Sequence, residues 1–508
     1  MNSKSRQLSN TPNRLSVSNR AELRKKIGTR EGEMVYQTDI NTTYSWFNSG
    51  VIDNNGTQIG TGAGWVHKPS ARVSVKVFGA VGDGVTDDTV AIQDCLNTQS
   101  SIYVPKGVFI VSKALYQQSY SKIVSDGTFK ASGILVGHEG VFYYDTVVEC
   151  TAVGLKIDCG DFPANSGVII RNNTTDIRLY DTEVRNASWD SSRGGGRGVI
   201  VEGNTGAANN TLVDGLRCDN VDTVMGVNGY TGSRKNNIIF SNITATNARV
   251  LIGLWGNGTG YPHTADSQSC IISNVTAHNI TMPVMSDRGG NAIISGVFIY
   301  NNAAVPKLDS VVRGYMNNVK ISDFTIESPK LSSIFNASPW SDNGSIVDLS
   351  LNIENCDIEI KHIGVTDDVF VNSYTRDNVI NCNLKIDSDQ VVSNKIGNLQ
   401  FAANTKSHVS VYNKEHNARI SGKPSEIKTA TFSINSNLDF ISKMKIGDSI
   451  FENKRISPVI NNSSSLGEHS HRYKDIFAFN GFDCLAPNGK RYKIGVDTSG
   501  NVIATFIT

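Results

Sequence analysis

The sequence lacks a long apolar run, an excess of charge of either sign and any paired-cysteine motif. No stretch approaches the roughly 18 to 20 apolar residues that a membrane-spanning helix needs, so no membrane insertion is expected. The first residues have no apolar segment behind them, which predicts a chain made in the cytoplasm without a signal peptide. The formal net charge is only +1, so the composition gives no polyanion-binding character and no nucleic-acid partner is expected.

Cysteine motifs are also missing. Eight cysteines are scattered along 508 residues with no C-x-x-C pair and no His/Cys ligand spacing, so no metal site and no cofactor are predicted. Most of these cysteines are expected to be buried thiols. Charged residues make up 19% of the chain, below the roughly 25% of ordinary domains. This balance, with its many Asn, Ser, Thr and Ile residues, suits an elongated β protein whose neutral polar surface binds sugars.

A glycine-rich turn at residues 77–89 marks the start of the main fold. Three glycines in six residues permit a tight turn with positive φ. Asp87 and Asp88 then precede a short amphipathic helix, and a strand–turn–strand segment follows at residues 102–111. We interpret the two aspartates as parts of a helix cap rather than as a catalytic pair or a metal site.

This order of glycine-rich turn, paired aspartates, helix and strand–Pro-x-Gly–strand resembles the first segment of the pectate-lyase-like family of right-handed parallel β-helices. Within that family the chain is most similar to bacteriophage tailspikes. The resemblance implies an all-β homotrimer with an N-terminal capping helix, held on the phage tail or baseplate, and thus in the virion, through its N-terminal region. It also implies a protein that binds and depolymerises capsular polysaccharide or lipopolysaccharide on the bacterial surface.

A repeat predicts a parallel β-helix independently of that resemblance. Short strands that alternate apolar and polar residues each end in an asparagine, and the intervals of 34, 27, 32 and 22 residues are typical of one solenoid coil with variable loops: Asn186, Asn220, Asn247, Asn279 and Asn301. Asparagine suits a sharp corner because it tolerates the left-handed conformation. A ladder of stacked asparagine side chains is an equally good interpretation.

The pattern divides the chain into three parts. Residues 1–72 are predicted as a polar arm, to about residue 27, and a small β-meander for virion attachment or trimer contact, in which Trp46 and Trp65 form a mini-core. Residues 73–394 are predicted as the β-helix, with the receptor-binding and catalytic surface. Residues 395–508 lack the coil repeat and are predicted as a separate, sandwich-like β domain for trimerisation or carbohydrate binding.

Counting eight residues beyond three closing asparagines predicts a column of side chains on one face of the β-helix. The column consists of Asn228, Trp255 and Asp287, with about 4.8 Å between coils. Loops beside the column bring further candidate substrate-binding residues to the same side: Trp189, Arg193, Tyr261, His263 and Arg288. Aromatic rings stack on the apolar faces of sugars, while amide and charged groups hydrogen-bond the hydroxyls.

Glycoside hydrolysis is the reaction that we expect at this column. It commonly needs two carboxyl groups, one of which protonates the leaving group. Four acidic residues on or near the face are candidates: Asp287, Asp190, Asp266 and Glu202. Asp287 is the first choice because its place in the column does not depend on an insertion.

Two alternatives remain open. A polysaccharide lyase would cleave a capsule that contains uronic acids by β-elimination, with His263 or Tyr261 as the base and with Arg288 and Arg193 neutralising the substrate carboxylate. A receptor-binding spike without catalysis would use the same side chains only for adhesion.

Overall fold

The computed structural model describes most of the first 395 residues and short strands beyond them. The described ranges are residues 15–67, 72–135, 140–160, 162, 165–190, 194–203, 206–230, 235–257, 268–302, 308–336, 353–371, 379–380, 383–395, 408–413, 431–434, 444–446, 449–452, 455–458, 482–485, 491–496 and 502–507. Within these ranges no helix is both long enough and apolar enough to cross a membrane.

A small N-terminal module consists of one helix and a five-stranded sheet in the order β1-β2-β3-β5-β4. Its elements are β1 (Leu15–Val17), α1 (Arg20–Lys25), β2 (Met34–Gln37), β3 (Thr42–Val51), β4 (Gln58–Ile59) and β5 (Gly62–His67). Strand β1 runs parallel to β2, and the other pairs are antiparallel.

The core of this module confirms the predicted role of the two tryptophans. Trp46 and Trp65 pair across β3 and β5, are 8% and 1% exposed, and meet edge-to-face with ring centroids 5.1 Å apart. Leu23 of α1 is fully buried. Residues 15–25 therefore belong to the module, which corrects the prediction of a polar arm as far as residue 27, because burial of Leu23 stabilises the helix more than local propensity does.

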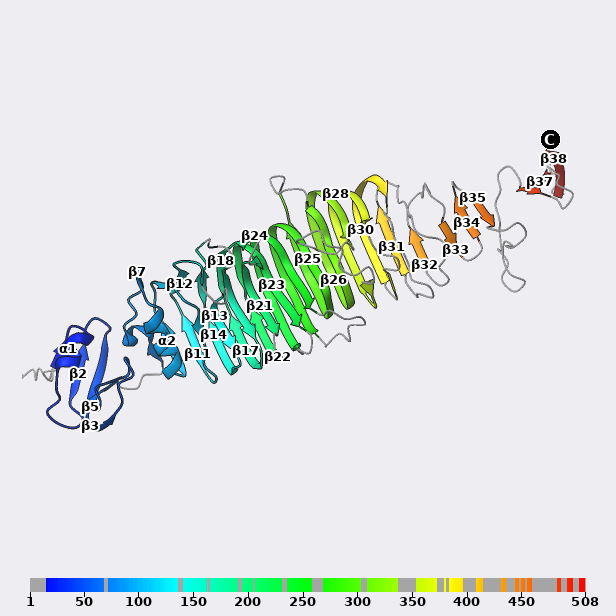
Figure 1. Cartoon of the computed structure of the whole chain (residues 1–508). Coiled ribbons are helices and arrows are strands. Elements are labelled where there is room, and N and C mark those ends of the chain that lie inside the picture. The colour runs from blue at the N-terminus through cyan, green and yellow to red at the C-terminus, as the bar shows by residue number, and fades with distance from the viewer. Residues whose placement is uncertain are drawn as a thin grey trace, which may run out of the picture. The chain divides into compact units, whose positions relative to one another are not determined.

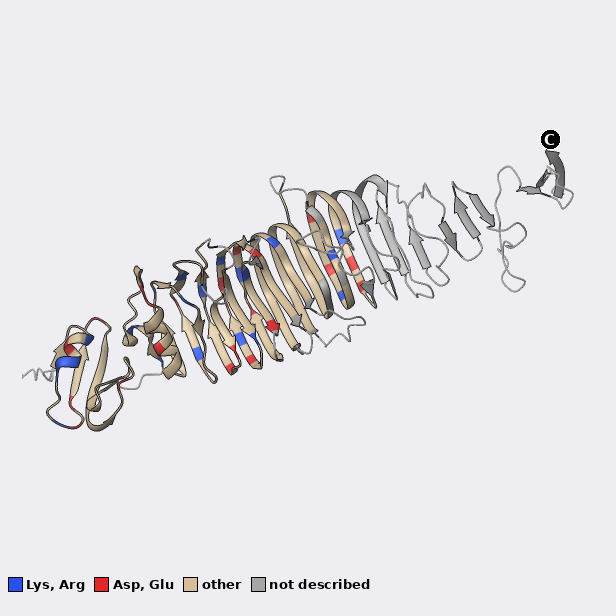
Figure 2. Ribbon diagram, in the orientation of Figure 1, with Lys and Arg blue, Asp and Glu red and all other residues tan. Residues whose placement is uncertain are grey.

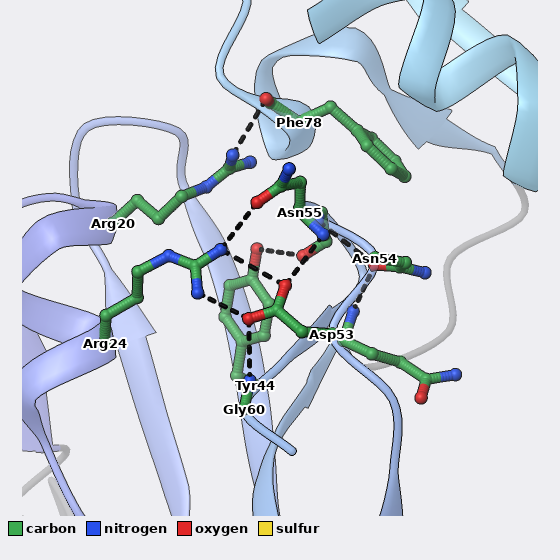
Figure 3. Close-up of polar contacts among 10 residues, drawn as sticks. Arg20, Arg24, Tyr44, Asp53, Asn54, Asn55, Gly60 and Phe78 are labelled. Atoms are coloured by element: carbon green, nitrogen blue, oxygen red, sulfur yellow. Dashed lines mark hydrogen bonds and ion pairs between the residues drawn. The ribbon is translucent and has the colours of Figure 1, made fainter.

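Two arginines of α1 tie the module together and join it to the turn that follows (Figure 3). Arg24 pairs with Asp53 and donates a hydrogen bond of 2.8 Å to Oδ1 of Asn55. Arg20 donates a hydrogen bond of 2.8 Å from Nη1 to the carbonyl oxygen of Phe78, which lies in the glycine-rich segment.

The glycine-rich segment forms a cap, as predicted. It contains β6 (Val73–Ser74), the 3₁₀ helix η1 (Val75–Phe78), β7 (Asp83–Asp87) and α2 (Thr89–Thr98). Asp88 is 1% exposed and accepts hydrogen bonds from the backbone N–H groups of Val81 and Gly82. Asp87 accepts one from the backbone N–H of Thr89 at the start of α2. Both carboxylates thus satisfy backbone donors of the turn and helix.

From this cap the chain winds into a parallel β-helix, with the strands of successive coils stacked on one another (Figure 1). Its strands are β8 (Ser101–Val104), β9 (Val108–Val111), β10 (Leu115–Tyr116), β11 (Lys122–Ser125), β12 (Thr128–Ala131), β13 (Gly140–Asp145), β14 (Val148–Val153), β15 (Lys156–Asp158), β16 (Ser166–Arg171), β17 (Thr174–Tyr180), β18 (Glu183–Ala187), β21 (Arg197–Gly203), β22 (Ala208–Asp214), β23 (Arg217–Tyr230), β24 (Lys235–Asn257), β25 (Gln268–Tyr300), β26 (Leu308–Asn336), β27 (Ile353–Glu354), β28 (Asp357–Val371), β29 (Val379–Ile380), β30 (Asn383–Lys395), β31 (His408–Asn413) and β32 (Thr431–Ile434).

Rows of apolar side chains fill the inside of the coils. One row continues in register through five coils, with every member no more than 1% exposed: Ala152, Leu179, Val213, Phe240 and Ile272. Burying such a side chain stabilises a fold by about 1.5 to 3 kcal/mol, so the stacked rows hold the coils together. Charged residues are scattered among mostly uncharged positions along the stack (Figure 2).

The closing asparagines form the corners that the repeat predicts, with one exception. Asn186, Asn220, Asn247 and Asn279 have φ between 54° and 58°. Their side chains also form a ladder, since the amide of Asn220 donates to Asn186 over 3.2 Å and that of Asn279 donates to Asn247 over 3.0 Å. Asn301 is instead buried and hydrogen-bonds both backbone groups of Ile280, each over 2.8 Å. The corners before Asn301 are therefore left-handed, and their side chains form two rungs, one between Asn186 and Asn220 and one between Asn247 and Asn279, while Asn247 itself donates to Asp219.

Beyond residue 394, parallel pairing continues from β30 to β31 and from β31 to β32. The predicted boundary at residues 394 and 395 and the sandwich-like C-terminal domain stay predictions. Further strands are β33 (Met444–Ile446), β34 (Ser449–Glu452), β35 (Arg455–Pro458), β36 (Phe482–Leu485), β37 (Arg491–Val496) and β38 (Val502–Ile507), of which the last three form an antiparallel sheet. Residues 448–450 and 455–508 form a compact unit of their own.

Candidate functional site

The strand register brings together Asn228 and Trp255, two of the three predicted column residues, and places Glu202 beside them. Glu202 of β21 pairs with Asn228 of β23, and Asn228 pairs with Trp255 of β24. Neighbouring strands lie about 4.8 Å apart, so these residues stack on one face across three successive coils. Glu202, which the sequence offered as one of several carboxylates, therefore stands in the column itself.

A β-bulge displaces Asp287 from the place that the sequence predicts. Leu254 pairs with Ser286, but Trp255 pairs with Arg288, so the strand holding Asp287 contains one additional residue at this point. Arg288 thus takes the column position beside Trp255, and the expected alignment of Asp287 is corrected. The side chains of Asp287 and Arg288 lie outside the described part of the structure, and their roles stay predictions.

The indole of Trp255 rests on two glycines of adjacent coils. Gly226 and Gly253 are in register, and a Cβ atom added to either would stand 2.3 Å or 2.1 Å from the ring. The ring is half-buried and packs against two small apolar clusters on the outer face: Tyr143, Ile169 and Ile200, and Val250, Met282 and Met285. Because side chains at these positions would displace the ring, the two glycines let it lie close to the sheet.

A cation also lies near this ring. The guanidinium carbon of Arg197 is 5.7 Å from the Trp255 ring centroid, within the range of cation–π attraction. Arg197 begins β21, the strand that ends beside Glu202. The surroundings of Trp255 thus combine an aromatic ring, a guanidinium group, a carboxylate and an amide.

Glu202 and Asn228 are both buried, at 8% exposure each. The Oδ1 atom of Asn228 accepts no hydrogen bond from any residue that the structure describes. The carboxylate of Glu202 likewise has no ion pair or hydrogen bond within the described ranges. Buried polar groups normally have partners, so this pair on an outer face has unused capacity to bind polar groups of a ligand.

In the two preceding coils, the residues in register with Glu202 are Arg171 and Asp145, which form an ion pair. Glu202 is in register with Arg171 of β16, and Arg171 with Asp145 of β13. Arg171 Nε lies 2.8 Å from Asp145, and its guanidinium carbon lies 4.7 Å from the Tyr143 ring centroid. Burial raises the pKa of Asp145, but the hydrogen bonds from Asn172 and Arg171 outweigh that rise and leave the pKa below its usual value.

Burial and nearby charges also act on the pKa of Tyr143, which is raised overall. Burial raises the pKa of its hydroxyl, the guanidinium of Arg171 opposes the rise, and the charge of Glu202 adds to it. Tyr116 stacks on Tyr143 with ring centroids 5.2 Å apart and remains 39% exposed. An exposed aromatic face therefore lies at the upstream end of the column.

A second charged group lies six residues before Trp255 on β24. Arg249 holds Asp222 through two hydrogen bonds of 2.6 Å and 3.1 Å, and Asp222 is 6% exposed. The guanidinium carbon of Arg249 lies 5.8 Å from the ring centroid of Trp189, which is 43% exposed. Trp189 belongs to a short hairpin of β19 (Trp189–Asp190) and β20 (Gly194–Gly195). The bidentate pair thus fixes a cation beside an exposed tryptophan.

Several predicted site residues cannot be placed by their side chains. Arg193, Tyr261, His263 and Asp266 lie outside the described residues, and Asp190 is described only as part of β19. Sequence reasoning missed Arg171, Arg197, Asp222 and Arg249. A signal for one pair was available, because Asp222 and Arg249 are separated by 27 residues, the same interval as Asn220 and Asn247.

No group of three or more His, Cys, Asp or Glu side chains that could hold a metal ion occurs in the described part of the chain. The six cysteines whose side chains are described are buried, as predicted for most of the eight: Cys95, Cys150, Cys159, Cys218, Cys270 and Cys356.

Comparison with known proteins adds phage relatives and a family match. A segment of 55 residues is 42% identical to the pre-neck appendage proteins of Bacillus phages phi29 and PZA, and it covers 11% of this chain but only 6% of each of these relatives. The chain thus spans a small fraction of the curated relatives that it matches.

Among solved structures, the chain is similar to a tailspike protein of Acinetobacter baumannii bacteriophage Fri1, described as a capsular polysaccharide depolymerase. The identity is 11% over 95% of this chain and 82% of that one, with a TM-score of 0.44. For the enzymatically active domain of bacteriophage CBA120 tailspike protein 2, the identity is 15% over 82% of this chain and 60% of that one, with a TM-score of 0.41. These scores are low, and strand pairing remains the basis for the fold.

The family match coincides with the β-helix. Residues 72–307 match the family described as "Rhamnogalacturonase A/epimerase, pectate lyase-like". This range begins just before β6 and includes the cap, the asparagine corners down to Asn301 and the whole Glu202–Asn228–Trp255 column. The resemblance to the pectate-lyase-like family that the glycine-rich turn indicates is therefore confirmed for residues 72–307 of this chain.

Proposed function

We propose that this chain is a phage spike that binds and depolymerises a bacterial surface polysaccharide, either capsule or lipopolysaccharide. The observation that carries the proposal is the stacking of Glu202, Asn228 and Trp255 on one face of the β-helix. A tryptophan ring offers a flat apolar surface to a sugar ring. The neighbouring amide and carboxylate have free capacity for hydroxyl groups, and the column runs from coil to coil, as an extended glycan requires.

Two further observations support the proposal. The family that matches residues 72–307 is described by the names rhamnogalacturonase and pectate lyase, both of which refer to action on polysaccharides. The curated relatives are appendage proteins of phages, which supports a place in the virion. Attachment to the tail through residues 1–72 and assembly as a homotrimer belong to the same proposal.

For the reaction, we favour hydrolysis by paired carboxyl groups. Glu202 is one partner because it stands beside Asn228 and Trp255. The second partner is Asp287, Asp190 or Asp266, of which Asp287 follows the column strand most closely. One carboxyl group protonates the leaving oxygen, and the other activates water or attacks the anomeric carbon.

A lyase is the second candidate, and the place of Arg288 beside Trp255 favours it. A guanidinium group there, with Arg193, would neutralise the carboxylate of a uronic acid, and His263 or Tyr261 would remove the proton next to it. An adhesin without catalysis is the third candidate and uses the same column.

Purified chain applied to host lawns and to isolated capsule or lipopolysaccharide separates these candidates. Depolymerisation releases reducing ends, whereas an adhesin only binds. A lyase product additionally absorbs ultraviolet light through its new double bond. Glu202→Gln and Asp287→Asn are expected to abolish cleavage with the fold intact. Asp176→Asn, at a corner where asparagine also accepts positive φ, is the matched control.

Unchanged turnover in Glu202→Gln refutes the role of Glu202, and unchanged turnover in Asp287→Asn refutes that of Asp287. Wild-type chain that neither cleaves nor binds any surface polysaccharide refutes the function as a whole. Light scattering of the full chain measures the oligomeric state independently, and a monomer contradicts the trimer.

A further inference from the structure

A pocket opens on the outer surface where the asparagine ladder stops. The corner side chains of Asn186 and Asn220 are hydrogen-bonded to each other, as are those of Asn247 and Asn279, but Asn301 turns inward and binds the backbone of Ile280. Beside Asn301 lies a cavity of about 270 Å³ that extends across three successive coils. Its wall includes Tyr300 from the end of β25, Glu327 from β26 and Ile363 from β28.

Register and packing fix the side chains that face this cavity. Tyr300 pairs with Glu327, and Glu327 pairs with Ile363. The Tyr300 ring meets His278 edge-on with ring centroids 6.0 Å apart and remains 41% exposed. Phe298, two residues earlier and therefore on the same face of the strand, is 42% exposed. An exposed aromatic surface thus adjoins the carboxylate.

Glycine lets the third coil approach the pocket closely. Gly364 has φ of 131°, and a Cβ atom there would stand 1.9 Å from the carbonyl oxygen of Ser328. No other residue fits this position without moving the backbone. The carboxylate of Glu327, for its part, forms no ion pair with any residue in the described ranges. The pocket therefore has a fixed wall and an available acceptor.

We propose that this pocket binds a single neutral sugar unit. The volume lies just below the roughly 300 Å³ at which pockets for drug-sized ligands begin, so it accommodates one ring rather than a chain. Tyr300 offers an apolar surface for the C–H face of the sugar. Glu327 accepts hydrogen bonds from two neighbouring hydroxyls, and the same carboxylate repels an anionic sugar.

This second site is distinct from the Trp255 column. The pocket lies at Asn301, which contacts Ile280, the residue that follows Asn279. The column residue on the same strand is Arg288, nine residues after Asn279, and nine residues of strand extend up to roughly 30 Å. Binding in the pocket requires no chemistry at the column and does not depend on the proposed function. If both sites are occupied by one polysaccharide, the pocket holds a neutral unit of the chain while the column faces the bond that is cleaved.

Saturation-transfer NMR on the full-length chain tests the pocket with four probes: glucose, galactose, N-acetylglucosamine and glucuronate. We expect at least one neutral sugar to receive saturation and glucuronate to receive little. Glu327→Gln is expected to weaken binding by about tenfold or more, the usual loss for a hydrogen bond to a charged group. Tyr300→Ala removes the apolar surface and should weaken binding in the same direction. Phe47→Ala, which shortens an aromatic side chain that is 39% exposed in the N-terminal module and outside both sites, is the matched control and should bind the neutral sugar as the wild type does.

Several results overturn the inference. The inference fails if no neutral sugar receives saturation, or if glucuronate binds as well as the neutral sugars. It also fails if both pocket variants bind the neutral sugar as the wild type does. Loss of the signal in Trp255→Ala alone assigns the binding to the column instead. Glu327→Gln keeps the shape of the side chain, so it remains informative if Tyr300→Ala does not fold. Polysaccharide cleavage by the pocket variants, measured in parallel, separates failure of this site from failure of the proposed function.

Discussion

The two glycines beneath Trp255 allow the position of its ring to be changed without removing the ring. A Cβ atom at Gly253 would stand 2.1 Å from the indole, and ordinary contact begins at 3.4 Å. In Gly253→Ala the ring must therefore retreat by about 1.3 Å. Gly253 is not among the residues with positive φ, so alanine fits the strand backbone without strain.

We expect this substitution to reduce kcat/KM for polysaccharide cleavage by about 10-fold to 100-fold, because a misplacement of about 1 Å at a substrate-positioning group can cost about 100-fold. The free energy of unfolding should change by less than about 1 kcal/mol, since the ring is half-buried and can swing outward. Trp255→Ala should lower activity in the same direction.

The assay is release of reducing ends from a capsule that the wild-type chain cleaves, together with a thermal melt of each variant. Gly133→Ala is the matched control, because no atom lies within 4 Å of a Cβ atom added there. Wild-type turnover in a folded Gly253→Ala variant would show that the position of the indole against the sheet is not needed to position substrate. A large loss of stability would show that the sheet, rather than the ring, takes up the clash.

Three further predictions concern the fold. Asn247→Ala forces alanine to a φ of 54° and removes hydrogen bonds to Asp219 and Asn279, so it should cost about 1 to 3 kcal/mol in chemical denaturation; Asn247→Gly should cost less, and equal losses would refute the role of the backbone conformation. Burial raises the pKa of the Cys270 thiol to about 12, so Cys270 in native protein should resist alkylation at mildly alkaline pH until the protein unfolds, as followed on its own peptide by mass spectrometry, and rapid labelling of Cys270 would contradict that burial. The pKa of Asp145 is lowered in the fold, so its contribution to stability is present above the ordinary value of 3.8 and is lost as pH falls through the folded pKa; melting temperatures of Asp145→Asn should fall less steeply with acid than those of the wild type, and parallel curves would refute the linkage.

The column shows how far the sequence could predict the site. The sequence aligns Asn228 and Trp255 correctly, because both lie eight residues after a closing asparagine and no bulge intervenes between their strands. Asp287 was misplaced by one residue, because the bulge opposite Leu254 and Trp255 has no signature in the local pattern. Glu202 could not be aligned from the repeat, since the hairpin at Trp189 lengthens the coil before it.

Arg197 shows a second limit. Nothing in its local sequence indicates contact with Trp255, which lies 58 residues later in the chain. The contact arises because the indole folds back over Gly253 and Gly226 toward the start of β21. Gly226 and Gly253, which are separated by one coil, could have indicated space for a side chain against the sheet. Only the packing shows that the indole of Trp255 fills this space.

The sequence by itself determined what short-range physics controls. Alternating apolar residues fix which side of each strand faces the core, asparagines with positive φ turn the corners, and glycines with two aspartates build the cap before α2. Only the tertiary structure decided the register between coils, and with it the columns on the outer face. Loops of different lengths separate the coils, and a slip of one residue moves a side chain to the opposite face of its strand. The fold was therefore readable from local patterns, whereas the identity of the residues beside Trp255 depended on the stacking of the whole β-helix.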